Sequence, residues 1–175
     1  MNWYTEIEPT VKISQGDILF DCPIFQVDPK SVAAEDPSKI TNVETLIFTD
    51  DVIVLTQACE LEQDNADMVV VAQLQTVKGL SWEFVSSVSA GRRPALSLIG
   101  KHEGLLRMNY KIVDFRTLYL VPTETVNNFA KHHGIRLRMN TPHRELLSQS
   151  FGNYFARIGL PNEDHIESKD LRNSL

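Results

Sequence analysis

Residues 52–55 form an uninterrupted run of four apolar side chains, and the run is bounded by polar residues on both sides. Because all four are β-branched or aliphatic, the run is typical of a strand that is buried on both faces. It follows two aspartates and gives way to Thr56, Gln57 and then a thiol and a carboxylate. We therefore expect a central strand over residues 51–60, with polar groups at its end.

Other segments of the chain show strand patterns, and turn residues bound them. The expected strands cover residues 18–25, 45–48, 68–74, 95–99, 107–120 and 135–139. Pro23 places the end of its strand at a sheet edge or a bulge, and the 107–120 segment is expected to bend near Asp114. Residues 26–45 form a long connection, and loops of this length are either functional or mobile.

Three helices are expected from capping signals and helical spacing. They cover residues 80–90, residues 125–133, and a final helix capped by Thr141 with Pro142 in its first position. Gly134 and Gly159 end the second and third helices. The apolar stripe of the final helix consists of Leu147, Phe151, Tyr154, Phe155 and Ile158.

The length of 175 residues fits one domain, which we expect over residues 1–161 with a flexible acidic tail at 162–175. Charge is uneven along the chain: the net charge of -6 combines -11 in residues 1–90, +7 in residues 91–160 and -2 in residues 161–175. Either the two parts neutralise one another within one domain, or a basic face meets an acidic partner, phosphate or protein.

Compartment and membrane association are predicted from apolar runs and cysteines. No apolar stretch reaches the roughly 18 residues of a membrane helix, and the acidic N-terminal segment lacks an apolar signal core. A cytoplasmic protein without membrane contact is the default expectation. Cys22 and Cys59 are then expected to be free thiols.

The order G-D-I, V-I-V-L-T-Q and M-V-V-V-A-Q-L over residues 16–74 resembles the strand layout of the PemK/MazF-type toxins. Over nearly its whole length the chain also resembles a group of uncharacterised bacterial proteins. Their signature L-[ST]-Q-x-C-[DE]-L falls at residues 55–61, V-D-F-R at 113–116, and P-x-R-E with R-x-G-L-P within 142–161. These resemblances imply an α+β fold, a small SH3-like (PemK/MazF-like) β-barrel of five to seven strands with C-terminal α-helices.

The chain departs from the toxin pattern at the residue that such nucleases use for catalysis. The toxins resemble one another in using an arginine after the first strand to stabilise the phosphate transition state, whereas this chain offers Lys30 and Lys39 there. The segment R-P-A-L at residues 93–96 resembles a toxin motif but follows the hairpin instead of preceding it. RNA cleavage is therefore the second hypothesis and not the first.

Cys59, with Glu60 and Gln57 beside it, is the candidate for nucleophilic catalysis. A catalytic cysteine needs a nearby histidine or cation to lower its pKa. No histidine lies within forty residues in the sequence, so His143 or another distant histidine would have to approach in the fold. The alternative is that Cys59 is a small buried residue at a strand end. The catalytic candidates are Cys59, Glu60 and His143.

The densest cationic cluster surrounds the strand at 135–139, where alternation places Arg136 and Arg138 on one face. The cluster either binds phosphate or nucleic acid, or forms a solvated face that pairs with the acidic first half. Arg144 is expected to pair with an acidic residue near Cys59. The binding candidates are Gln57, Arg136, Arg138, Arg144 and Gln149.

Asp114 and Arg116 are two residues apart on one strand, and we interpret them as a structural pair on a common face. The chain has no close pairs of cysteine or histidine of the kind found in zinc sites. We therefore expect neither a metal nor another cofactor.

The leading hypothesis is a non-enzymatic binding or accessory protein of a bacterial system that acts through protein contacts. Its acidic and basic parts would form separate partner surfaces. A toxin-like endoribonuclease that contacts nucleic acid through residues 91–160 is the alternative, and a Cys59-dependent enzyme is a weaker one. The sequence leaves the oligomeric state open.

Overall fold

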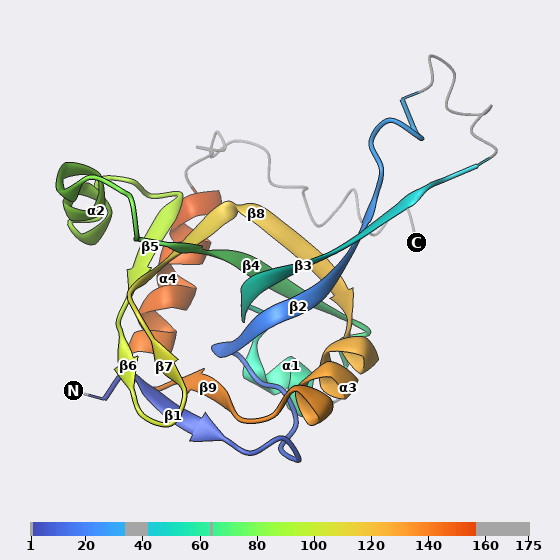
Figure 1. The fold of residues 1–175 in the computed structure, drawn as a ribbon, viewed down its shortest axis with the longest axis horizontal. Coiled ribbons are helices and arrows are strands. Elements are labelled where there is room, and N and C mark those ends of the chain that lie inside the picture. The colour runs from blue at the N-terminus through green and yellow to red at the C-terminus, as the bar shows by residue number, and fades with distance from the viewer. Residues whose placement is uncertain (1, 34–41, 64, 157–175) are drawn as a thin grey trace, which may run out of the picture.

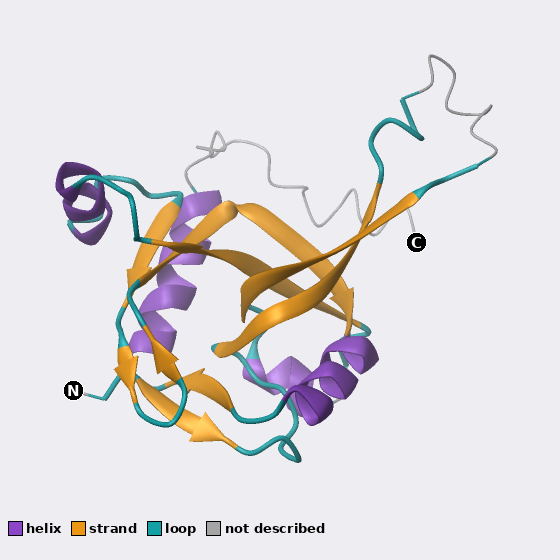
Figure 2. Ribbon diagram, viewed as in Figure 1, coloured by secondary structure: helices purple, strands orange, loops and turns teal. Residues whose placement is uncertain are grey.

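The computed structural model describes residues 2–33, 42–63 and 65–156, and within them the fold is α+β (Figures 1 and 2). An antiparallel seven-stranded sheet has the order β1-β9-β2-β3-β4-β8-β5. Its strands are β1 (Tyr4–Ile7), β2 (Asp17–Val27), β3 (Thr45–Val54), β4 (Met68–Thr76), β5 (Leu96–Ile99), β8 (Lys111–Pro122) and β9 (Arg136–Met139). A short hairpin, β6 (His102–Glu103) and β7 (Arg107–Met108), forms a separate two-stranded sheet. Antiparallel pairing throughout agrees with the short connections between most of these strands.

The central apolar run is buried on both faces of the sheet, as its composition predicts. Val52 and Val54 belong to one core cluster, while Ile53 and Leu55 belong to the cluster on the opposite face. The strand begins earlier than expected, because residues 45–48 and 51–54 form the single strand β3.

The prediction that the central strand continues to residue 60 is wrong, because a five-residue helix, α1 (Ala58–Glu62), follows β3. The Thr56 hydroxyl accepts a hydrogen bond of 2.8 Å from the backbone N–H of Val70, in place of a main-chain carbonyl. The Gln57 carbonyl then accepts from the N–H of Leu61 and begins the helix. The side chain of Thr56 thus ends the ladder one residue before the helix starts.

Bulges bend two strands of the sheet and make it curl. The pairing register of β2 shifts between Leu19 and Cys22, directly before Pro23, and the register of β8 shifts after Asp114. Both positions agree with the sequence-based expectations for Pro23 and Asp114. The two edge strands approach each other, and the Tyr4 hydroxyl of β1 donates 2.9 Å to the carbonyl of Gly100 beside β5.

Helices cover both faces of the sheet. Helix α4 (His143–Phe155) packs through Leu147 on one face, while α1 and α3 (Thr123–His133) pack on the other. Helix α2 (Trp82–Ser89) lies at the β5 end with its own small cluster around Val88. Among the described residues, no helix has both the length and the apolar character needed to span a membrane.

The expected cap of the last helix is wrong, because Pro142 occupies the N-cap position and no side chain caps the helix. The hydroxyl of Thr141 instead contacts the carboxylate of Glu145 at 3.0 Å. Phe155, expected in the apolar stripe, is 49% exposed. Ile158, Gly159 and the predicted tail at 162–175 lie outside the described residues.

Strands β2 and β3 continue beyond the body of the sheet as a two-stranded ribbon, which we call the arm (Figure 1). The arm consists of residues 22–27 of β2 and 45–50 of β3, paired in antiparallel register. The strands therefore extend into the segment expected to be a long connection. Residues 34–41 of that connection lie outside the described part of the chain.

Candidate functional site

Among the described residues, strand β5 forms one end of the sheet and pairs only with β8. Hydrogen-bonded and non-hydrogen-bonded residue pairs alternate along an antiparallel ladder. The N–H of Phe115 donates a hydrogen bond of 2.9 Å to the carbonyl of Ala95, so these two residues form a hydrogen-bonded pair. By alternation along β5, Ser97 and Ile99 also belong to hydrogen-bonded pairs, whereas Leu98 does not. The backbone N–H and C=O of Leu98 therefore point away from β8, toward the open edge.

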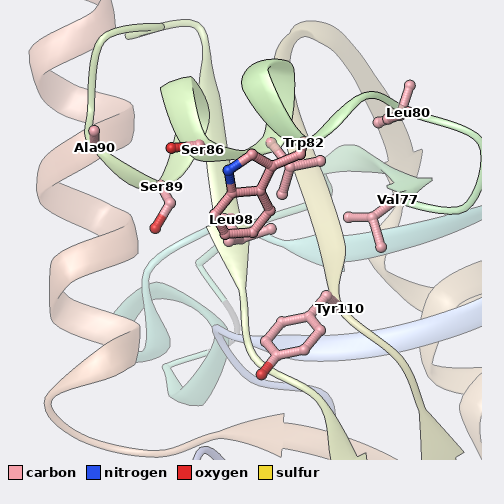
Figure 3. Close-up of a pocket in the computed structure, with 9 residues that line it drawn as sticks. Val77, Leu80, Trp82, Ser86, Ser89, Ala90, Leu98 and Tyr110 are labelled. Carbon is pink, nitrogen blue, oxygen red and sulfur yellow. The ribbon is translucent and has the colours of Figure 1, made fainter.

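An apolar hollow of about 710 Å³ lies beside this edge, between α2, β5 and the segments that follow β4 and precede β8 (Figure 3). Trp82 enters from α2 and Tyr110 from the segment before β8 (Figure 3), and their exposed fractions are 77% and 42%. The hollow is lined by Val77, Leu80, Trp82, Val85, Ser86, Ser89, Ala90, Leu98 and Tyr110. Exposed aromatic rings of this kind are typical of protein-recognition surfaces.

Local interactions hold α2 in place although its outer face is exposed. The Ser81 hydroxyl accepts 3.2 Å from the N–H of Phe84 and caps the helix. The Arg93 guanidinium lies 4.5 Å from the centroid of the Phe84 ring and donates 2.7 Å to Ser87. Trp82 is therefore presented to solvent on an anchored helix and not on a loose loop.

Further hollows continue along the β5 edge to α4. One of about 510 Å³ is lined by residues of α2, β5 and α4, and one of about 140 Å³ reaches His143. The Trp3 ring stacks on His143 with centroids 3.7 Å apart and an interplanar angle of 7°. A Cβ on Gly100 would lie 2.6 Å from that ring, so Trp3 covers this end of the edge.

The Nε2 atom of His143 is buried and has no hydrogen-bond partner in the described structure. It lies at the end of the hollow that reaches α4, beneath Trp3. A buried polar atom without a partner carries a free-energy cost. This atom is therefore a ready hydrogen-bonding group for a molecule that enters the groove.

The combined feature, which we call the β5 groove, is apolar at its centre and cationic at its margin. Among the nine residues that line its main hollow, Tyr110 is the one titratable side chain. Residues 77–101, which supply most of the lining, contain Lys78, Arg92, Arg93 and Lys101 against Glu83 alone. The arrangement suits an apolar segment with flanking negative charge, and its lining offers no nucleophile with an adjacent base.

The two strand arginines expected to bind phosphate are held by a buried carboxylate. Asp17 is fully buried, and Arg136 and Arg138 donate to it at 2.7 and 2.5 Å. Arg136 is 3% exposed and also donates to the carbonyls of residues 8, 11 and 12. These contacts favour the alternative in which the strand face pairs with the acidic first half of the chain.

The cysteine candidate is exposed, and His143, the histidine expected to approach it, lies elsewhere in the described structure. Cys59 is exposed on α1, so the expectation that it is a buried strand residue is wrong. Its Sγ atom lies 3.7 Å from the side-chain oxygen of Gln57, and Glu60 is exposed beside it. His143 instead stacks on Trp3, so the structure does not join the three catalytic candidates.

The side chain of Gln15 links the final helix to the region of the signature at residues 55–61. The Gln15 amide donates 3.1 Å to the carbonyl of Leu55 and 2.9 Å to the hydroxyl of Ser148. The expected pairing of Arg144 with an acidic residue near Cys59 is wrong, because Arg144 pairs with Glu145 at 2.8 Å. Gln149 is exposed on the same helix.

A polar network crosses β3, β4 and β8 on the face that also holds Cys22. Asp114 accepts a bidentate contact from Arg116, which confirms that these two residues form a pair. Asp50 accepts from Tyr119 at 2.9 Å, and burial together with this hydrogen bond raises the pKa of Tyr119 to about 12. Burial, reinforced by the Asp50 charge, raises the pKa of the Cys22 thiol to about 12. Both groups are therefore neutral and unreactive near pH 7.

Among the described residues, no group of three or more histidine, cysteine, aspartate or glutamate side chains is arranged to hold a metal ion.

Sequence patterns did not identify the residues of the β5 groove. The signal that was present is Trp82, an aromatic residue in the helix expected over residues 80–90. Its exposure cannot be read from the pattern, because an aromatic residue in a helix is usually part of the core.

No family model matches the chain, and neither a curated protein nor a solved structure matches it. The function is therefore inferred from the geometry of the site.

Proposed function

We propose that this protein is a non-enzymatic binding protein that recognises an extended, apolar segment of a partner protein in the β5 groove. The observation that carries the proposal is the outward-facing backbone of Leu98 beside the exposed rings of Trp82 and Tyr110. An added strand pairs with an open sheet edge through its main chain, while neighbouring pockets select its side chains. The groove offers both elements at one place.

The length of the open edge limits the segment that can bind. β5 has four residues, the N–H of Leu96 already donates to the carbonyl of Arg93, and Trp3 covers the Gly100 end. Leu98 is thus the residue that can exchange both backbone hydrogen bonds with a partner. One bound residue would pair with Leu98, and apolar side chains near it would occupy the hollow.

The strength of the interaction follows from the area that can be buried. Covering about 100 Å² of the exposed Trp82 ring contributes about 2–3 kcal/mol at 25 cal/mol per Å². Tyr110 and the two hydrogen bonds of Leu98 add similar amounts, from which the entropy of ordering the segment is subtracted. The gross contribution is about 6–9 kcal/mol before this subtraction, so the dissociation constant should be micromolar or weaker.

The toxin-like nuclease receives less support from the contacts. Arg136 and Arg138, its best cationic candidates, are already bonded to Asp17 and to backbone carbonyls. Releasing Arg136 to bind phosphate would remove one of the two guanidinium groups that pair with the buried carboxylate of Asp17, which is costly. The Cys59-dependent enzyme also receives less support, because among the described residues His143 stacks on Trp3 and does not approach the thiol.

The finer fold assignment, a small SH3-like barrel of the PemK/MazF type, belongs to the same proposal. The bulges in β2 and β8 and the hydrogen bond from Tyr4 to Gly100 support it, since they bring the edges of the sheet together. A cytoplasmic location is also proposed, because Cys22 and Cys59 are free thiols.

Selection from a library of random peptides, displayed with and without flanking acidic residues, tests the proposal. Selected peptides should be apolar, and fluorescence polarisation should show at least tenfold weaker binding to Trp82→Ala. Leu105→Ala is the matched control, because Leu105 is 84% exposed and does not line the groove. Equal binding to the two variants would contradict the groove assignment.

Amide hydrogen exchange measured by NMR reports the pairing of Leu98 directly. Its N–H faces the open edge and should exchange quickly in the free protein, then slowly when peptide is bound. The amide of Ser97 is the internal control, because it pairs with β8 and should be protected in both states. Protection of Leu98 that does not change on binding would refute strand addition.

A further inference from the structure

The arm carries a second exposed apolar surface, on the face that holds Phe25, Val27 and Ile47. Phe25 and Ile47 lie directly opposite each other in the ladder, so they share a face, and Val27 is two residues further along. Their exposed fractions are 42%, 46% and 69%. Apolar side chains grouped on a projecting ribbon are typical of an interaction site.

The backbone of the arm is also available for pairing. The N–H of Asp28 donates 2.8 Å to the carbonyl of Glu44, which fixes the alternation along the ribbon. By that alternation the N–H and C=O of Ile47 point outward, away from β2. Within the described residues β4 pairs with β3 only at positions 52–54, so this outer edge of the arm is open.

The arm and the β5 groove are complementary in charge. Described residues 21–31 and 42–51 contain five acidic side chains and one lysine; Asp51 pairs with Lys111, and Asp28 and Glu44 follow and precede the last paired residues of the arm, Val27 and Thr45. The groove segment at 77–101 contains four basic side chains and one acidic one, and of the four basic ones Lys101 pairs with Glu103. Opposite charges around two apolar surfaces favour their association and orient it.

The arm cannot reach the groove of its own chain. The arm projects from one end of the molecule, whereas α2 and β5 lie at the other (Figure 1). A contact between these surfaces therefore requires two molecules.

We propose that the β5 groove binds the arm of a second copy of this chain, with Ile47 of one copy exchanging backbone hydrogen bonds with Leu98 of the other. The side chain of Ile47 then lies beside Leu98, in the hollow formed with Trp82 and Tyr110. This inference rests on the proposed function of the groove and names its partner. Because the two surfaces differ, the contact is heterologous, and it assembles copies head to tail or in a closed ring.

The test is the mass of the protein in solution, measured by light scattering and sedimentation at roughly 100 µM, where a micromolar interface is largely occupied. The wild type should have at least twice the chain mass of 19.8 kDa. Ile47→Asn and Trp82→Ala should each have the mass of one chain. Both side chains are more than two-thirds exposed, so the folds should be retained. Leu105→Asn is the matched control and should assemble like the wild type.

Mixing the two variants distinguishes this contact from every self-complementary one. Ile47→Asn keeps an intact groove and Trp82→Ala keeps an intact arm, so the mixture should form a complex that contains both chains. An arm-to-arm or groove-to-groove contact predicts no such recovery, and that result would overturn the proposal. Assembly should also weaken as salt shortens the Debye length from about 10 Å at 0.1 M to 3 Å at 1 M.

Failure of this inference can be told apart from failure of the proposed function. A wild type that stays a single chain at this concentration, yet binds selected apolar peptides through Trp82, overturns the self-association and leaves the groove a binding site for another protein. A wild type that neither assembles nor binds peptides overturns both.

Discussion

Replacing Asp17 by alanine should destabilise the protein strongly, because it removes the carboxylate at the centre of a buried ion cluster. Asp17 is fully buried and accepts hydrogen bonds from Arg136, Arg138 and the backbone N–H of Ser14. Without it, the guanidinium of Arg136 stays buried with backbone carbonyls as its only acceptors. Breaking a buried pair by removing one partner costs about 3–5 kcal/mol.

Urea unfolding followed by circular dichroism measures this loss. A domain of this kind is stable by about 5–15 kcal/mol. With a slope of about 2 kcal/mol per M, the midpoint should fall by about 2 M while the slope stays unchanged. Asp17→Asn keeps one oxygen that can accept from an arginine, so its midpoint should lie between those of Asp17→Ala and the wild type.

Glu103→Ala provides the control for a generic ion pair. Glu103 pairs with Lys101 at 2.6 Å, but the two side chains are 74% and 50% exposed, so little change in the midpoint is expected. If Asp17→Ala lowers the midpoint no further than Glu103→Ala does, the cluster is not a structural element. Arg136 and Arg138 would then return as candidates for phosphate binding.

Three further predictions follow from individual side chains. Burial raises the pKa of the Cys22 thiol from 9.0 to about 12, so at alkaline pH the unfolded chain loses this proton before the folded chain does. The contribution of this thiol to the free energy of unfolding is therefore fully present below pH 9. Above pH 9 the free energy of unfolding should fall by about 1.4 kcal/mol per pH unit. Urea titrations at alkaline pH should show a shallower decline for Cys22→Ala, and an equal decline would count against the assignment. Because Cys59 is exposed and Cys22 is buried, a disulfide-exchange reagent at pH 8 should modify one thiol in the native protein and two in urea. Modification of both thiols in the native protein would show that Cys22 is not buried. Gly16→Ala should lower the urea midpoint more than Gly134→Ala does. Both glycines have positive φ, but of the two only Gly16 is crowded, because a Cβ added there would lie 3.0 Å from the Cβ of Met139. Equal midpoints for the two variants would show that crowding at Gly16 is unimportant.

Strong local patterns predicted most of the elements in the sheet. The run at 52–55 and the return strand at 68–74 are strands, and the segment at 125–133 lies within α3. In each case the hydrophobic period and the bounding turn residues agree, so tertiary contacts reinforce the local preference. Short elements were less predictable. Helix α1 depends on a bond from Val70 to the side chain of Thr56, and that partner is fourteen residues away.

Local sequence patterns predicted the interaction partners of the candidate residues even less well than the short elements. Alternation places Arg136 and Arg138 on one face of a strand, and both do reach one carboxylate. That carboxylate belongs to Asp17, and its sequence separation of 119 residues from Arg136 hides the pairing from any local pattern. Arg144 was assigned a distant acidic partner, yet its partner is its neighbour Glu145.

By itself the sequence determined which segments form most of the strands, because hydrophobic periodicity is a local property that folding must satisfy. It also determined the separation of acidic and basic segments along the chain. Only the tertiary structure decided which strand lies at the edge of the sheet, and therefore that Leu98 presents its backbone beside Trp82 and Tyr110. Edge position and exposure depend on which segments pair across the whole chain, and the side chains of β5 alone do not encode that pairing.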